Sequence, residues 1–242
     1  MAKELQKLLS TVRQATEHYE MIQDGDRIAV GLSGGKDSGA LLLALAKMRA
    51  FYPKKFTLCA VTVDLGFDGG EESVAVLDAW CRSLDTELYV VRTDIAAIVF
   101  RERREKNPCS LCAKMRRGAL INEAIRVGAN KIALGHQLED AAETMMMSLI
   151  HEGRIGSFMP VTVYEDTGID VIRPLIYTRE ADIKSVVRAE NVPVIKSLCP
   201  ENGETERAGM KEILKSLERE HRGVYKRIIG ALEKQGLDGW KE

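Results

Sequence analysis

Short apolar segments rich in β-branched residues alternate with helical segments from residue 27 to residue 151. Strands are predicted at residues 27–33, 56–64, 87–95 and 130–135. Helices are predicted at residues 38–52, 70–84, in a segment that ends at Arg126, and at 138–151. This alternation is typical of a parallel sheet with helices on both faces. The predicted fold class is therefore α/β, a doubly wound parallel sheet whose strands end on one edge.

The segments flanking this core are predicted to be mainly helical. Apolar residues at helical spacing run from residue 3 to residue 22, and two more helices are expected at 206–220 and 223–235. Between them the pattern is less regular, with an apolar segment at 170–175, a helix at 178–190 and a short strand at 192–197. The expected partition is an N-terminal helix (1–24), a central domain with an inserted Cys-x-x-Cys element (25–200) and a C-terminal helical extension (201–242).

Composition excludes several classes of protein. The chain is 45% hydrophobic and 29% charged, and no apolar run approaches the roughly 20 residues of a membrane span. The N-terminus lacks the apolar core of a secretory signal. Five cysteines, an odd number, argue against a disulfide framework, so the expected compartment is the reducing cytoplasm.

The net charge of −1 does not mark a nucleic-acid-binding protein, but cations gather locally between positions 101 and 117. They are Arg101, Arg103, Arg104, Lys106, Lys114, Arg116 and Arg117. With Glu102 and Glu105 interleaved, the segment can be a solvated, salt-bridged helical surface. A patch that contacts phosphates is equally consistent with the sequence, since it needs clustered cations rather than net charge.

A glycine-containing turn follows the first predicted strand directly. It consists of Ser33, Gly34, Gly35, Lys36, Asp37 and Ser38. The glycines let backbone N–H groups approach an anion, and the helix that follows presents its amino-terminal amides and positive dipole end. The turn is too short for the G-x-x-x-x-G-K-[ST] loop of common nucleotide triphosphatases.

A second polar segment follows the fourth predicted strand. It begins Gly135-His136 and continues through Asp140 and Glu143, which share one helix face at i, i+3. A carboxylate at this edge of the sheet can position magnesium or accept a proton.

The turn at residues 33–38 resembles the SGGKDS signature of the PP-loop ATP pyrophosphatases, whose fold is of the adenine nucleotide alpha hydrolase-like type. The resemblance implies that Ser33 to Ser38 hold the pyrophosphate end of ATP, with Lys36 and Asp37 in catalysis. Asp64, at the end of the second strand, is implied in contacts to the nucleoside, although it can also cap the next turn. Residues 135–144 resemble the GHxxDDxxET element of PP-loop enzymes that act on tRNA, which implies ATP-site roles for Gly135 and His136 and a catalytic role for Asp140. Glu139 departs from that pattern, which has aspartate there.

Two cysteines, Cys109 and Cys112, begin the segment PCSLCAKMRRG. The spacing alone fits a redox pair, half of a zinc site, part of an iron–sulfur site or two buried thiols. A preceding proline, a following helix and nearby arginines are expected to favour the thiolate. A structural zinc site needs four ligands, and the chain offers neither a second Cys-x-x-Cys nor a suitable histidine pair. Cys59 and Cys81 are expected to be buried core residues.

With the later Cys199-Pro200, this segment resembles the tRNA 2-thiocytidine synthetases of the TtcA type. The resemblance implies a 4Fe–4S cluster on Cys109, Cys112 and Cys199, with one iron free to deliver sulfur, and RNA contacts from Arg116 and Arg117. It further implies ATP and Mg²⁺, a tRNA substrate, sulfide or a cysteine desulfurase as sulfur donor, and a homodimer. The implied reaction is adenylation of a pyrimidine carbonyl oxygen, such as that at C2 of an anticodon-loop cytidine, followed by its replacement with sulfur.

Several alternatives stay open at this point. A persulfide carried on cysteine can replace a cluster-bound sulfide. Thiolation of a tRNA uridine, or another PP-loop sulfur transfer, fits the same motifs. Other classes are a lysidine- or amide-forming PP-loop ligase and a non-enzymatic iron–sulfur RNA-binding protein.

Overall fold

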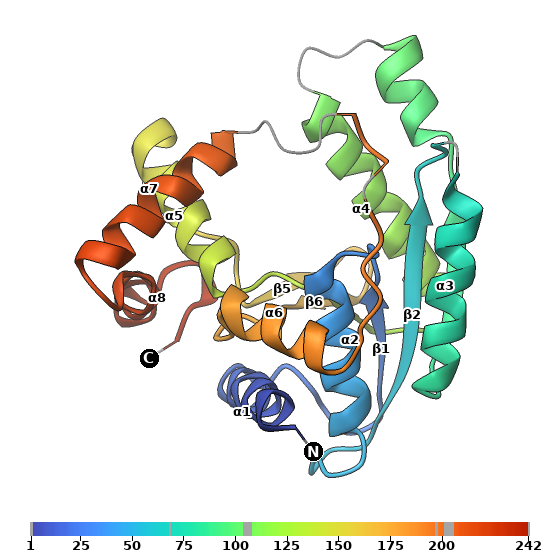
Figure 1. Ribbon diagram of the computed structural model, residues 1–242, viewed down its shortest axis with the longest axis horizontal. Coiled ribbons are helices and arrows are strands. Elements are labelled where there is room, and N and C mark those ends of the chain that lie inside the picture. The colour runs from blue at the N-terminus through green and yellow to red at the C-terminus, as the bar shows by residue number, and fades with distance from the viewer. Residues whose placement is uncertain (1, 68, 104–107, 197, 201–205, 242) are drawn as a thin grey trace.

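The computed structural model describes residues 2–67, 69–103, 108–196, 198–200 and 206–241 (Figure 1). Its elements are, in chain order, α1 (Lys3–His18), β1 (Asp26–Gly31), α2 (Lys36–Met48), β2 (Phe56–Asp64), α3 (Gly70–Ser83), β3 (Glu87–Arg92), a short π-helix (Ala97–Glu102), α4 (Pro108–Arg126), β4 (Lys131–Ala133), α5 (Leu138–Glu152), β5 (Val161–Tyr164), β6 (Ile169–Ile172), α6 (Glu180–Ala189), α7 (Glu206–Glu220), α8 (Val224–Gln235) and a 3₁₀ turn (Leu237–Gly239). No helix among the described residues is long and apolar enough to cross a membrane.

The strands form one six-stranded sheet in the order β3-β2-β1-β4-β6-β5. All neighbours are parallel except the hairpin of β5 and β6. The chain moves outward from β1 to β3 and then returns to place β4 on the other side of β1. The predicted doubly wound α/β sheet is confirmed, and the loops after β1 and β4 meet where the winding direction reverses.

Helices cover both faces of the sheet through two apolar cores. On one face α2 is buried almost all round, and α1, α3 and α6 pack with it in the larger core. On the other face α4 contributes Leu120 and Ala124 to a smaller core with Cys59 of β2 and Ile132 of β4. The full burial of Cys59 and Cys81 confirms their prediction as core residues.

Three details differ from the sequence prediction. Residues 192–196 are extended but form no strand, because Ile195 N–H bonds to the carbonyl of Gly34 (2.8 Å) rather than to a neighbouring strand. Strand β5 was missed, since it is a four-residue edge strand with only partial burial. The N-terminal helix ends at His18, and the residues up to Ile22 enter the core as a loop. The predicted boundary after residue 200 falls at 201–205, outside the described residues.

Candidate active site

Two serines brace the turn after β1. Ser38 Oγ donates to the Gly35 carbonyl (3.0 Å) and accepts from Ser33 N–H (3.2 Å). Ser33 Oγ lies 3.1 Å from Ser38 Oγ and accepts from Gly35 N–H (3.3 Å). Gly34 has φ +78°, a left-handed conformation that favours glycine. The turn is therefore fixed with α2 starting directly behind it, an arrangement suited to anions.

The Lys36 ammonium lies between two carboxylates. It is 2.7 Å from Asp37 Oδ2 and 3.2 Å from Glu180 Oε1, at the start of α6. Burial lowers the pKa of Lys36, but Asp37 and Glu180 outweigh burial, so the net shift is upward. Glu180 also binds Lys211 of α7 (3.0 Å), and its own pKa falls to about 2 because these lysines outweigh its burial. Lys36 is therefore a permanent cation beside the turn.

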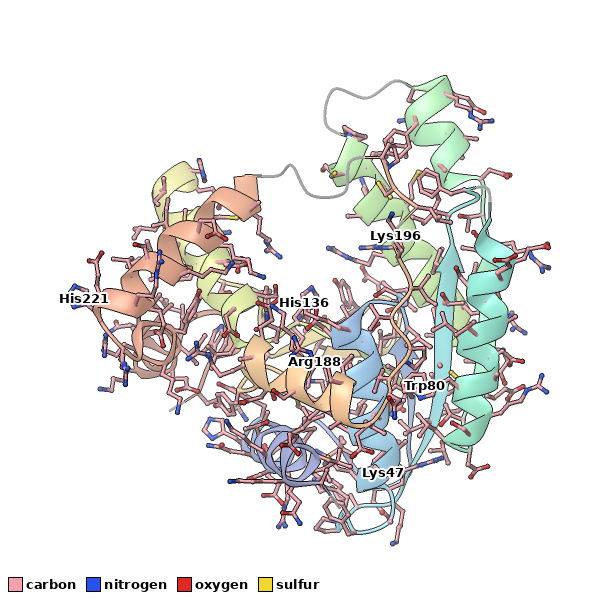
Figure 2. All side chains as sticks on the ribbon, in the orientation of Figure 1. Lys47, Trp80, His136, Arg188, Lys196 and His221 are labelled. Carbon is pink, nitrogen blue, oxygen red and sulfur yellow. The ribbon has the colours of Figure 1, made fainter. Side chains whose placement is uncertain are left out.

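A cavity of about 640 Å³ opens at the carboxyl edge of the sheet. Most of the predicted site residues line it: Ser33, Gly34, Gly35, Asp37, Ser38, Asp64, Arg116, Arg117, Gly135, His136 and Cys199. Figure 2 shows His136 between α5 and the first turn of α2, with Lys196 across from it beside α4. Of the other predicted residues, Lys36, Asp140, Cys109 and Cys112 lie outside this lining.

Asp64 is the last residue of β2, and its side chain both caps a turn and lines the cavity. Its Oδ1 accepts a hydrogen bond from Gly66 N–H (3.0 Å), which is the turn-capping role, while its side chain also lines the cavity. The start of α3 approaches it closely, because a Cβ on Gly70 would lie 3.3 Å from Asp64 Oδ1. The turn-capping role of Asp64 is therefore confirmed, whereas its contact with a nucleoside stays a prediction.

His136 is held as a neutral imidazole. Burial, followed by the charges of Arg173 and Arg207, lowers its pKa to about 3. Its ring lies 4.8 Å from the ring of Phe158, centroid to centroid, and its buried Nδ1 makes no hydrogen bond within the described residues. At neutral pH this side chain offers hydrogen bonding and a flat surface to a ligand, and no charge.

The start of α5 is capped by its own sequence. Gln137 Oε1 accepts from Glu139 N–H (2.7 Å), and Asp140 Oδ2 accepts from Gln137 N–H (3.0 Å). Glu139, the departure from the tRNA-enzyme pattern, is buried and accepts from Arg179 Nε (2.6 Å) and Glu180 N–H (2.9 Å). Its longer side chain therefore joins α5 to the start of α6, a structural contact.

The three cysteines of the predicted cluster come from two segments, the start of α4 and residues 198–200. Cys109 is exposed and Cys112 half-buried on the first turn of α4, and Cys199 is half-buried in the cavity wall. Burial raises the pKa of the Cys112 thiol, Arg116 opposes the rise, and Cys199 and Cys109 add to it. The expectation that helix and arginines favour the thiolate is therefore wrong for Cys112, because burial outweighs them. Cysteine thiolates are the usual ligands of iron–sulfur clusters, so this donor set fits one. However, no three His, Cys, Asp or Glu side chains in the described part of the chain are arranged to hold a metal ion.

The cations between positions 101 and 117 divide into two groups. All five described cations are exposed, but only Arg116 and Arg117, on α4, line the cavity, and Arg101, Arg103 and Lys114 do not. Arg104 and Lys106 lie outside the described residues. The two arginines next to the cysteine motif are therefore the ones placed to meet a ligand in the cavity.

Sequence reasoning missed the contribution of residues 179–218. Helices α6 and α7 bring three charged residues to the site, Glu180, Arg207 and Lys211. None of the three belongs to a recognisable sequence motif. The sequence places them in the first or second turn of predicted helices. Charged residues are common at such positions, so this placement did not mark them as site residues.

The family model of the PP-loop domain matches residues 3–214. The chain belongs to the PP-loop family. Similar curated relatives are the tRNA-cytidine(32) 2-sulfurtransferases of Geobacter metallireducens (36% identical, covering 95% of this chain and 90% of the relative) and Shewanella amazonensis (37% identical, covering 96% and 74%). At this identity and coverage, the chain belongs with the sulfurtransferases of the PP-loop family.

Solved structures of similar fold include a tRNA thiolase. The U34-tRNA thiolase NcsA from Methanococcus maripaludis, solved with its 4Fe–4S cluster, has a TM-score of 0.79 and 25% identity, covering 93% of this chain and 77% of that one. The NH3-dependent NAD synthetase from Campylobacter jejuni, at 17% identity and a TM-score of 0.51, shares the fold, covering 96% of this chain and 93% of that one. The PP-loop resemblance drawn from residues 33–38 is confirmed.

The buried carboxyl group of Glu143 leads to a prediction about how stability depends on pH. Glu143 is 2% exposed, and its Oε1 has no hydrogen-bond partner among the described residues. Burial, and then the neighbouring Asp140, raise its pKa to about 7. Because the folded state binds this proton more tightly than the unfolded chain, Glu143 costs stability as pH rises from about 4.5 to about 7, by roughly 2 to 3 kcal/mol.

Glu143→Gln removes this titration, so the variant should gain about 2 kcal/mol over the wild type between pH 5 and pH 8. Urea unfolding at both pH values measures the difference in the free energy of unfolding. Glu152→Gln, an exposed position at the end of the same helix, is the control and should show no such pH-dependent gain. An equal Glu143→Gln effect at pH 5 and pH 8 would contradict the raised pKa.

Proposed function

We propose that this protein is an ATP-dependent tRNA thiolase that replaces the C2 oxygen of an anticodon-loop cytidine with sulfur. The observation that carries the proposal is the single cavity shared by the braced turn, Arg116, Arg117 and Cys199. It joins an anion site, cations suited to RNA phosphates and a cysteine at one edge of the sheet. The names of the curated relatives support tRNA and cytidine as substrate.

The first step we propose is adenylation. The amides of residues 33–38 and the Lys36 ammonium bind the β- and γ-phosphates of ATP, and magnesium enters bound to those phosphates. The cytidine carbonyl oxygen attacks the α-phosphorus, the bond from phosphorus to the bridging oxygen breaks, and pyrophosphate leaves. Lys36 and the loop amides stabilise the charge that grows on the leaving phosphates. Asp140, whose pKa is raised chiefly by burial and is also affected by the charges of Asp37 and Lys36, is our candidate for proton handling.

The second step is displacement by sulfide. Sulfide forms a bond to C2, the bond from C2 to oxygen breaks, and AMP departs with that oxygen. Cys109, Cys112 and Cys199 would hold a 4Fe–4S cluster, which supplies an iron site without a protein ligand that can bind sulfide. The cluster in the similar thiolase NcsA supports this assignment. The target base must leave its stack to enter the cavity, which favours a single-stranded loop.

Three further assignments belong to the same proposal. The sulfur donor is sulfide or a cysteine desulfurase, the active form is a homodimer, and the compartment is the cytoplasm. The reducing conditions that free cysteines require support the compartment.

Anaerobic reconstitution with iron and sulfide, followed by incubation with ATP, magnesium, sulfide and unmodified tRNA, tests the proposal. Mass spectrometry of the digested nucleosides should find 2-thiocytidine. A thiolated uridine would favour the second candidate, which the similarity to a U34-tRNA thiolase supports. A protein that binds no iron, or a tRNA that gains no sulfur, would contradict both.

A further inference from the structure

Arg207, on the first turn of α7, crosses to α5. Its Nη2 donates to Thr144 Oγ1 (2.8 Å), and Thr144 Oγ1 in turn donates to the carbonyl of Asp140 (2.8 Å). Its Nη1 lies 4.0 Å from Asp140 Oδ1, beyond hydrogen-bond distance. The guanidinium is therefore hydrogen-bonded to a neutral hydroxyl and forms only a long ion pair with the Asp140 carboxylate.

The charge of Arg207 affects the pKa values of three titratable side chains at the carboxyl edge of the sheet. It lowers the pKa of His136 and opposes the burial-driven rise of the pKa values of Asp140 and Glu143. Lys36 and Asp37 act on the same Asp140 carboxylate. Arg207 lies four residues before Lys211, on the same face of α7. Lys211 binds Glu180, and Glu180 in turn binds Lys36 of the braced turn. The guanidinium therefore lies on the side of α7 that faces the phosphate-binding turn we propose.

Most of the hydrogen-bonding capacity of Arg207 remains available. A guanidinium has five N–H donors, and among the described residues Thr144 accepts the one hydrogen bond found for this side chain, which is 42% exposed. The planar fork matches the spacing of two phosphate oxygens. In Figure 1, α7 and α5 stand on the opposite side of the molecule from α4, which carries Arg116 and Arg117.

We propose that Arg207 binds a phosphate group of the reacting substrates, on the side of the site away from α4. This inference rests on the proposed thiolation. Two phosphates lie at such a position during adenylation, the α-phosphate of ATP and a backbone phosphate beside the target nucleotide. Arg207 thus supplies a cation from α7, a helix that carries none of the sequence motifs.

The test compares Arg207→Ala and Arg207→Lys with Arg219→Ala, an exposed arginine on the same helix. We expect Arg207→Ala to lower kcat/KM for thiolation about 100-fold. Arg207→Lys should recover only part of this loss, because an ammonium lacks the fork. Equal unfolding midpoints for the three variants would show that the fold is retained.

Binding measurements identify which phosphate is bound. If it is the α-phosphate, the Kd of Arg207→Ala for ATP rises about tenfold, with tRNA binding unchanged. If it is the tRNA backbone, tRNA affinity falls and the slope of log K against log salt decreases by about one, with ATP binding unchanged. The inference is overturned if Arg207→Ala matches Arg219→Ala in kcat/KM, both affinities and the salt slope. A wild-type protein that binds ATP and tRNA but transfers no sulfur would instead overturn the proposed function.

Discussion

Replacing Cys112 with alanine is expected to abolish sulfur transfer to tRNA while ATP affinity stays within about twofold of wild type. Cys112 is the cysteine on whose pKa both other proposed ligands, Cys109 and Cys199, act. Its loss leaves two of the three proposed cluster ligands. The turn at residues 33–38, where we propose that ATP binds, is braced by its own serines and by Ile195, so it does not depend on this thiol. Iron content, ATP binding by calorimetry and nucleoside mass spectrometry measure the three effects separately.

Cys81→Ala is the matched control for this experiment. Cys81, in the last turn of α3, is fully buried in the core, and burial raises its pKa to about 12, so it is no nucleophile. That variant should keep both iron and thiolation, with a modest loss of stability of about 1 kcal/mol. If Cys112→Ala kept its iron but lost thiolation, cysteine persulfide would replace the cluster as the sulfur carrier. Full thiolation by Cys112→Ala would rule out both roles.

The parts of the molecule that are local in sequence could be predicted. The four strands β1 to β4 follow from short runs of apolar, β-branched residues, and three of them, β1, β2 and β4, are largely buried in the sheet. The turn at residues 33–38 was predictable because the hydrogen bonds of its two serines fall within six consecutive residues, whereas the bond from Ile195 N–H comes from a distant segment. Asp64 and His136 followed from the rule that parallel strands end at one edge, and both line the same cavity.

The contacts that close the site could not be predicted in this way. Residues 192–196 have the composition of a strand, but their partner is the Gly34 carbonyl, far away in the sequence. Glu180 meets Lys36, and Arg207 meets Thr144, only because α6 and α7 fold back onto α2 and α5. Periodicity predicts that these helices exist, but the tertiary packing alone decides which charged residue reaches the active edge.

Replacing Gly135 with alanine is expected to weaken ATP binding about 100-fold, because the loop after β4 presses on the first turn of α2. A Cβ at position 135 would lie 2.9 Å from the Ser38 nitrogen and 3.0 Å from the Asp37 carbonyl carbon, both backbone atoms. Neither side can yield easily: β4 is a buried inner strand, and α2 is buried almost all round. The strain therefore displaces the amides of residues 35–38 from the positions that the phosphates require.

Isothermal titration with ATP measures this loss, and the overpacking should also lower the free energy of unfolding by about 1 to 3 kcal/mol. Gly230→Ala is the matched control, because a Cβ there meets no atom within 4 Å and the residue lies inside α8. That variant should bind ATP normally and gain about 0.5 to 1 kcal/mol from better helix propensity. Since Gly135 is needed for space and not for a positive φ, serine should be at least as damaging as alanine. Unchanged ATP affinity in Gly135→Ala would show that the turn and the β4 loop are not packed as one unit, and the phosphate site would then have to be formed by the turn alone.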